Sequence, residues 1–237
     1  MDILRYARDL GLRRPDETDV IARLADACSE LEVEHACFAS KVPGNDTLVG
    51  FATYSEHWRK HYLEQDFHLI DPTLQKMMHA MGPVDWERLR DLDGYDPVFR
   101  EAHDFDIPET GMSVPIRGPF GERSVLTLAT RATPQAWSIQ KRAIMQDVQQ
   151  IAARLHDEIM LSGKVMLSLD LPSLSTREIE ILQWIAAGKS QQDVADILSI
   201  SNRTVEVHLR SVRCKLGAVT TAQAVARAIG MQLIYPL

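Results

Sequence analysis

The sequence has few of the residues that build disulfide-linked or metal-containing proteins. Of its 237 residues only three are cysteines, Cys28, Cys37 and Cys214, and none belongs to a CxxC pair. An odd number of separated cysteines indicates reduced thiols and excludes a disulfide framework or a cysteine-based zinc site. The eight histidines lack metal-ligand spacing, and no GxxxxGK phosphate-binding loop occurs. We therefore expect no metal and no cofactor.

Long hydrophobic runs are also lacking. No apolar stretch approaches the roughly 20 residues that a membrane-spanning helix needs. The first residues, MDILRYARDLG, are too short and too charged for a signal peptide. We expect a cytoplasmic protein. A hydrophobic content of 45% with 25% charged residues indicates globular structure, and the length permits one large or two small domains.

Positive charge is scarce over most of the chain, which has a formal net charge of −7. Residues 1–172 carry 19 basic and 28 acidic residues, whereas residues 173–237 carry seven basic and five acidic ones. The weakly positive C-terminal part suits a nucleic-acid partner, and the acidic part would be repelled by DNA. The charge distribution thus favours two domains with different partners.

The C-terminal part contains three helix starts, at Ser175, Ser190 and Ser201, each followed by apolar residues at helical spacing. Glu178 lies three positions after Ser175 and completes a capping-box pattern. Gly188 is well placed to end the first of these helices. Three short helices with a tight turn before the last predict helix-turn-helix architecture.

The last of these three helices has the pattern of a recognition helix. Val205 and Leu209 belong to its apolar stripe, whereas Arg203 and Arg210 lie on the opposite face. A helix that presents arginines among small side chains suits the major groove of DNA. A solvated helix of an all-α bundle is the alternative. The residues predicted to contact DNA are Arg203, Thr204, Glu206, Val207, Arg210, Ser211 and Lys215.

This part of the chain resembles, nearly position for position, the DNA-binding domain of LuxR-type regulators. The resemblance rests on the stretches TREIEILQWIAAGKS, DVADILSIS and RTVEVHLRSVRCKLG. Glu178, Leu182 and Gly188 fall on signature positions of that domain. The resemblance covers about the last quarter of the chain and implies double-stranded DNA as a partner. It leaves open what the rest of the chain senses.

Strand and helix patterns are interspersed in the N-terminal part. We expect strands at 35–42, 48–55, 110–118 and 123–131, and helices at 18–31, 56–64, 73–81, 95–105 and 138–160. Two hairpins among helices indicate an antiparallel sheet with helices on its faces, an α+β fold.

A stretch without helical periodicity, which contains Gly163 and Pro172, separates the two parts. We place a linker there. The predicted organisation is a sensor domain at 1–161, a linker at 162–174 and a helix-turn-helix domain at 175–237.

Several aromatic and polar residues of the sensor part stand out, although each has an ordinary structural interpretation. Trp58 and Tyr62, one helical turn apart, are more often core residues. Asp71 before Pro72 is most often a helix N-cap. Gly111 is typical of a tight backbone position ahead of a strand. These alternatives remain open from the residues alone.

Taken together, the stretches YSEHWRKHYLEQDFHLIDPTL, VDW and TGMSVPIRG resemble the autoinducer-binding domain of LuxR-type quorum-sensing receptors. The hallmark positions are Trp58, Tyr62, Asp71, Pro72, Trp86 and Gly111. The resemblance implies an α/β/α sandwich that binds an N-acyl-homoserine lactone, and a ligand-binding set of Tyr54, Trp58, Tyr62, Asp71, Thr73, Trp86, Gly111 and Thr127.

The resemblance also implies a role for individual residues of that set. Trp58 would hydrogen-bond the lactone carbonyl, and Asp71 would accept from the amide N–H. Tyr54 and Thr127 would contact the amide carbonyl, and Trp86 would wall the lactone ring. An apolar cavity with a few fixed polar groups agrees with such a ligand.

We therefore expect a lactone-gated transcription regulator that binds palindromic DNA as a homodimer, with RNA polymerase as a further candidate partner. The alternative is a LuxR-type regulator that senses a different small apolar ligand or acts without one. A response regulator would need an alternating β/α receiver domain, and that pattern is lacking. An enzyme would need a nucleophile–base pair, a metal cluster or a phosphate-binding loop. The sequence indicates none of these, so we expect no enzymatic activity.

Overall fold

The computed structural model describes residues 17–41, 48–77, 79–118, 121–161 and 172–235. The chain divides into two compact units. The first comprises residues 1–41, 47–118 and 123–168, and the second comprises residues 42–46, 119–122 and 169–237. In these described ranges, no helix has the length and apolar character required to cross a membrane. The expected linker at 162–174 lies mostly outside the described residues. Of the turns expected to join the two hairpins, the one at 43–46 lies wholly outside them, and only residues 121–122 of the one at 119–122 are described.

The first unit is built on a five-stranded sheet in the order β2-β1-β5-β4-β3, with every pair antiparallel. The strands are β1 (His35–Lys41), β2 (Leu48–Ala52), β3 (Val84–Asp85), β4 (Thr110–Arg117) and β5 (Arg123–Thr130). The central strand β5 is buried almost throughout, because it pairs on both sides and is covered on both faces.

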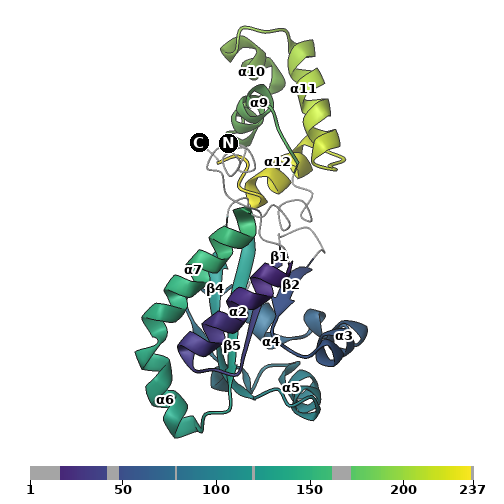
Figure 1. Ribbon diagram of the computed structural model, residues 1–237. Helices are drawn as coiled ribbons and strands as arrows, with labels where there is room; N and C mark the ends of the chain where they lie inside the picture. The colour runs from purple at the N-terminus through teal and green to yellow at the C-terminus, as the bar shows by residue number, and fades with distance from the viewer. Residues whose placement is uncertain (1–16, 42–47, 78, 119–120, 162–171, 236–237) are drawn as a thin grey trace. The chain divides into compact units, whose positions relative to one another are not determined.

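Helices cover both faces of this sheet (Figure 1). One face carries α2 (Glu17–Leu31) and α7 (Met145–Leu161), which is preceded by α6 (Pro134–Ala143). The other face carries α3 (Glu56–Glu64), α4 (Pro72–Met77) and α5 (Tyr95–Asp104), with the 3-10 turns η1 (Phe67–Leu69) and η2 (Trp86–Leu89) between them. The predicted sandwich of helices around an antiparallel sheet is confirmed.

The single helix predicted at 138–160 is wrong, because α6 and α7 are separate helices that break at Ile144. The first begins earlier than predicted, since the Thr133 side chain caps it ahead of Pro134 at its first position. The predicted apolar stripe of α7 is buried inside the unit, with Val148 and Ile159 fully inaccessible. It therefore leaves no surplus apolar face.

The helix predicted at 73–81 ends early, at Met77. The Arg117 guanidinium from β4 donates hydrogen bonds to the carbonyl oxygens of Met77, at 3.1 Å, and Ala80. These are carbonyls that a longer helix would have used internally. The positive charge of Arg117 at the C-terminal end of α4 also interacts favourably with the negative end of the helix dipole.

The second unit consists of α9 (Thr176–Ala186), α10 (Gln191–Ile197), α11 (Asn202–Lys215) and α12 (Thr221–Gly230). Ser175, Ser190 and Ser201 cap the first three helices as predicted. Gly188 has a φ of +84°, in the left-handed region that glycine enters without steric cost, and it follows the C-cap of α9. The predicted helix-turn-helix architecture is confirmed.

A buried carboxylate joins α9 to α11 within this unit. Glu178 is 3% exposed and accepts hydrogen bonds from the Ser175 amide (2.7 Å), the Ser211 hydroxyl (2.6 Å) and the Lys215 ammonium group (2.7 Å). Burial by itself would raise the pKa of Glu178, but the hydrogen bonds from Lys215, Ser211 and Ser175 outweigh it and lower the pKa to about 2. The ionised carboxylate thus holds the two helices together.

We expect Glu178→Gln to destabilise the second unit by roughly 2–3 kcal/mol at pH 7. The pKa of Glu178 is lower in the folded state than its ordinary value of 4.5, so this stability is present above pH 4.5 and is lost as the pH falls toward 2. The measurement is hydrogen exchange at the amides of α9 and α11, as a function of pH.

Glu180→Gln is the matched control, because Glu180 pairs with Arg177 at the surface and is 43% exposed. It should change the exchange rates little. Equal effects of the two substitutions at pH 7 would contradict the role given to Glu178.

Candidate functional site

A cavity of about 390 Å³ lies between the sheet and the helices α3 and α4 of the first unit. Its sheet side is made of small side chains. Cys37 and Ala39 on β1 lie directly opposite Ala52 and Gly50 on β2, so all four face the same side. Because these side chains are small, they leave space between the sheet and the helices that can hold an extended apolar molecule.

Asp71 provides the buried charge of this cavity. It is 7% exposed, accepts from the Tyr62 hydroxyl at 2.7 Å, and caps α4 by accepting from the Thr73 amide at 2.7 Å. Burial raises the pKa of Asp71, and the hydrogen bonds from Thr73 and Tyr62 counteract this rise. The residue is therefore both the helix cap and a cavity residue.

Trp58 also lines the cavity. It lies on α3, which Ser55 caps by accepting from the Trp58 amide. The Trp58 ring is 4% exposed and packs 5.7 Å from the Tyr62 ring and 5.3 Å from the Phe105 ring. No described residue accepts a hydrogen bond from its indole N–H. That N–H belongs to a residue of the cavity lining, so it is available to a carbonyl group of a ligand.

Trp86 is held in place by a hydrogen-bonded chain. Its indole N–H donates to the Ser113 hydroxyl at 2.9 Å, and Ser113 lies 3.3 Å from the Thr127 hydroxyl. The Trp86 ring also packs edge-on against Phe99 at 5.1 Å. Ser113 was missed in the sequence, although its position two residues beyond Gly111 on one strand places it on the cavity side of β4.

Gly111 does not line the cavity, in contrast to the other seven predicted ligand-binding residues. A Cβ atom at this position would come within 2.2 Å of the Leu128 carbonyl oxygen and 2.9 Å of the Trp86 ring. The lack of a Cβ atom at Gly111 thus makes room for the Trp86 ring beside β4, and its role as a ligand contact stays a prediction. The predicted residues that the cavity brings together are Tyr54, Trp58, Tyr62, Asp71, Thr73, Trp86 and Thr127.

Most of the remaining lining could not be identified from the sequence. The missed residues are Cys37, Ala39, Leu48, Gly50, Phe51, Ala52, Arg59, Leu63, Leu74, Val98 and Ile107. The small residues at alternate positions of β1 and β2 were the one signal that could have revealed the sheet side. Burial, followed by the nearby Asp71 charge, raises the pKa of Cys37 to about 12, so this thiol stays protonated and is a poor nucleophile.

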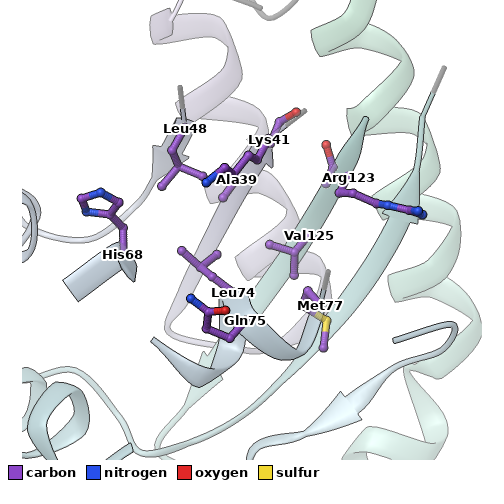
Figure 2. Close-up of a pocket in the computed structure, with 11 residues that line it drawn as sticks. Ala39, Lys41, Leu48, His68, Leu74, Gln75, Met77, Arg123 and Val125 are labelled. Atoms are coloured by element: carbon purple, nitrogen blue, oxygen red, sulfur yellow. The ribbon is translucent and has the colours of Figure 1, made fainter. Parts of the chain in front are cut away.

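Figure 2 shows a second, smaller cavity of about 100 Å³. The two share Ala39, Leu48 and Leu74 in their linings. The rest of the small cavity is more polar, with side chains from the ends of β1 and β5 and from α4 and η1: Ser40, Lys41, His68, Gln75, Met77, Arg123, Ser124 and Val125.

The recognition helix α11 presents its predicted face to solvent. Arg203, Glu206, Val207 and Arg210 are exposed, whereas Val205, Leu209 and Val212 are buried in the core of the second unit. Thr204 is half-buried, with its hydroxyl 2.7 Å from that of Ser201.

Two predicted DNA contacts point elsewhere. Ser211 and Lys215 both donate to Glu178, so they serve the contact between α9 and α11. Within the described residues, Glu206 makes no ion pair with Arg203 or Arg210, and the exposed face therefore keeps its charged groups free for a partner.

Two family models match the chain. The model described as "Autoinducer binding domain" matches residues 16–159, and the model described as "Bacterial regulatory proteins, luxR family" matches residues 172–228. The first match covers the sheet and the cavity, and the second covers the helix-turn-helix.

Proteins of known role are similar over most of the chain. The transcriptional activator protein RaiR of Rhizobium etli is 34% identical over 227 residues, which cover 94% of this chain and 87% of that protein. The HTH-type quorum-sensing regulator RhlR of Pseudomonas aeruginosa is 32% identical over 181 residues, 76% of this chain and 74% of that protein. These relatives are regulators of transcription, not enzymes.

The fold is also that of a solved structure. Escherichia coli SdiA aligns with a TM-score of 0.77 at 22% identity, over 99% of this chain and 100% of that one. The chain therefore belongs to the LuxR family of transcription regulators, with an autoinducer-binding domain followed by a LuxR-type helix-turn-helix DNA-binding domain.

Proposed function

We propose that the signal bound by this regulator is an N-acyl-homoserine lactone. The observation that carries the proposal is the buried Asp71 carboxylate in the lining of a largely apolar cavity that Tyr62, Trp58 and Trp86 also line. A buried charge that lacks donors is costly, and the amide N–H of an acylated amine supplies one. The cavity side chains match the remaining groups of such a ligand.

In this arrangement the ligand amide N–H donates to Asp71, and the lactone carbonyl accepts from the Trp58 indole. The hydroxyl groups of Tyr54 and Thr127 lie in the same lining and donate to the amide carbonyl. Trp86, fixed by Ser113, forms the wall beside the lactone ring. The acyl chain extends over the small residues of β1 and β2.

Ligand binding of this kind stabilises the sensor unit by mass action, because only the folded unit has the cavity. The test is titration of the purified protein with acyl-homoserine lactones, followed by binding to operator DNA and recovery of the ligand. A regulator returns the lactone intact and binds DNA more tightly with it. Hydrolysed lactone, or DNA binding that ignores lactone, would contradict the proposal.

We expect Asp71→Asn to weaken lactone binding roughly tenfold to a hundredfold, the effect of losing a charge-assisted hydrogen bond. Asparagine is also a good N-cap, so the start of α4 is preserved and the substitution isolates the ligand contact. The measurement is a lactone titration by calorimetry. Asp66→Asn is the control, since Asp66 is exposed and its side chain caps nothing in η1. An unchanged lactone response in Asp71→Asn would show that Asp71 is only the N-cap of α4 and does not contact the ligand.

We also infer that the protein binds DNA as a homodimer, because one recognition helix reads too few base pairs for specificity. The apolar side of α12 is available for pairing: Ala222 and Ala226 are exposed, Val225 is half-buried and Ile229 is 37% exposed. Two-fold pairing would place α11 of each protomer on palindromic half-sites about one helical turn apart.

The expected result is a dimer of the lactone-bound protein at micromolar concentration, measured by light scattering. Ala226→Glu would place a charge on the exposed face of α12 and should shift the mass toward the monomer. Val207→Glu, on the exposed face of α11, is the control and should leave the mass unchanged. A monomeric wild-type protein would contradict the inference.

The exposed face of α11 makes a distinct prediction for base reading. Arg203 and Arg210 are suited to guanine, and Glu206 can accept from the N4 amine of cytosine. If Glu206 reads a base, Glu206→Ala should relax preference at one position of each half-site by roughly 1–3 kcal/mol, while affinity for unrelated DNA rises slightly. Binding-site selection with this variant is the measurement.

Arg210→Ala is the comparison variant. If Glu206 only orients an arginine, both substitutions should weaken preference at the same guanine. If both variants keep the base preferences of the wild type, this face of α11 does not determine sequence specificity.

A further inference from the structure

Gly50 is a glycine in the middle of β2 that the backbone does not require. Glycine weakens the interior of a strand, where it usually marks a bulge or a close approach of another backbone. β2 has no bulge, because its pairing with β1 runs from Ala52 to Leu48 without a skipped residue. The φ angle of Gly50 also lies outside the left-handed region that favours glycine. An ordinary strand residue would therefore suit the backbone at this position.

No neighbouring group requires a glycine at this position either. A Cβ atom at Gly50 would lie 3.7 Å from the Phe38 carbonyl oxygen, which is an ordinary van der Waals contact. Among the described residues beyond its chain neighbours, no other atom would come within 4 Å of that Cβ atom. By contrast, a Cβ atom at Gly111 would meet the Leu128 carbonyl oxygen at 2.2 Å. Gly50 therefore leaves a space that alanine could enter without moving the protein.

The space left by Gly50 belongs to the large cavity. Gly50 lies directly opposite Ala39 on β1, and residues opposite one another in antiparallel strands point to the same face. Both residues line the cavity. Gly50 is exposed, although its partner Ala39 is only 5% exposed. A side chain at position 50 would therefore project from the sheet side of the cavity into the volume available to a ligand.

Gly50 lies far from the polar groups on the sheet side of this cavity. Thr127 on β5 is opposite Cys37 on β1, which is in turn opposite Ala52 on β2, so the three residues form one row across the sheet. Gly50 is two residues beyond this row along β2. Its Cα atom is therefore about 7 Å along the strands and about 10 Å across them from that of Thr127, a separation of roughly 12 Å.

Only a long acyl chain covers this distance. In the proposed arrangement the Thr127 hydroxyl contacts the amide carbonyl, so the chain starts near Thr127. A hexanoyl group continues from its carbonyl carbon by five carbon–carbon bonds of about 1.5 Å, which together give at most about 8 Å. A dodecanoyl group continues by eleven such bonds, which give at most about 16 Å. The last carbons of the dodecanoyl group can lie over Gly50, whereas those of the hexanoyl group cannot.

We propose that Gly50 determines the length of the acyl chain that the domain accepts, because it leaves space for the last carbons of a chain of about ten carbons or more. The inference deepens the proposed function and rests on it, since the chain is that of an acyl-homoserine lactone. Its basis is exclusion by size. A larger side chain at position 50 would occupy the volume of those carbons, and a close-packed interior does not expand freely to readmit them.

The test is a calorimetric titration of the full-length protein and its Gly50→Val variant with hexanoyl- and dodecanoyl-homoserine lactone. Valine favours strands, so β2 should form in the variant. We expect Gly50→Val to weaken dodecanoyl-lactone binding roughly tenfold to sixtyfold, because two or three methylene groups lose their burial and each is worth about fourfold in affinity. The affinity for the hexanoyl lactone should remain that of the wild type.

Gly50→Ala is the second variant, because its Cβ atom makes only an ordinary contact with the protein. It should lower the dodecanoyl-lactone affinity alone, by about fourfold, the value of one methylene group. Val49→Ile is the matched control, since Val49 is next to Gly50 on β2, lies opposite Ser40 and does not line the large cavity. It adds volume on the other face of the same strand and should leave both affinities unchanged.

Three results would overturn the inference while leaving lactone as the signal. An unchanged dodecanoyl-lactone affinity in Gly50→Val would show that the acyl chain does not pass over Gly50. An equal loss for both lactones would show a general disturbance of the cavity, and the same loss in Val49→Ile would show a disturbance of β2. Failure of the wild type to bind either lactone would instead contradict the proposed function, and this inference with it, so the two failures are distinguishable.

Discussion

Each unit of this protein contains a buried carboxylate, and the partners of the two carboxylates differ. Glu178 receives three donors from its own unit, two of them from α11. Asp71 receives hydrogen bonds from Tyr62, Thr73 and Leu74 in the lining of a cavity that is otherwise largely apolar. A buried ionised group is costly unless donors surround it. The partners of Glu178 join two helices of the second unit, whereas Asp71 lies where the proposed ligand would bind.

The two units also differ in how their interiors are filled. The helix-turn-helix unit has a complete core of small and branched side chains, and its recognition face is formed without any outside group. The sensor unit has a cavity over the small side chains of its sheet. A ligand that binds there, as proposed, would stabilise the folded sensor unit by mass action.

The sequence was sufficient for the features that local chemistry determines. The serine caps at Ser175, Ser190 and Ser201 and the β-rich runs at 35–42 and 123–131 predicted elements that the structure contains. Features that depend on distant partners could not be predicted. The end of α4 depends on Arg117 from β4, forty positions away from Met77. No glycine or proline lies near Ile144, so the sequence does not indicate the break between α6 and α7.

The candidate site shows the same limit. The polar and aromatic residues of the cavity could be named because the family resemblance marks them, but their geometry could not. Gly111 was expected to contact ligand, and its lack of a Cβ atom makes room for the Trp86 ring. Ser211 and Lys215 were expected at DNA, and they face Glu178 because the helical stripe of α11 brings them onto α9. Strand register, which relates Gly50 to Ala39, is likewise invisible until the sheet order is known.

The central claim is that a ligand completes the environment of Asp71. The most direct measurement is mass spectrometry of the small molecules extracted from the folded protein after its expression beside a lactone-producing strain. The account predicts an acyl-homoserine lactone at close to one molecule per chain. Folded, DNA-binding protein that carries no lactone under these conditions would contradict it.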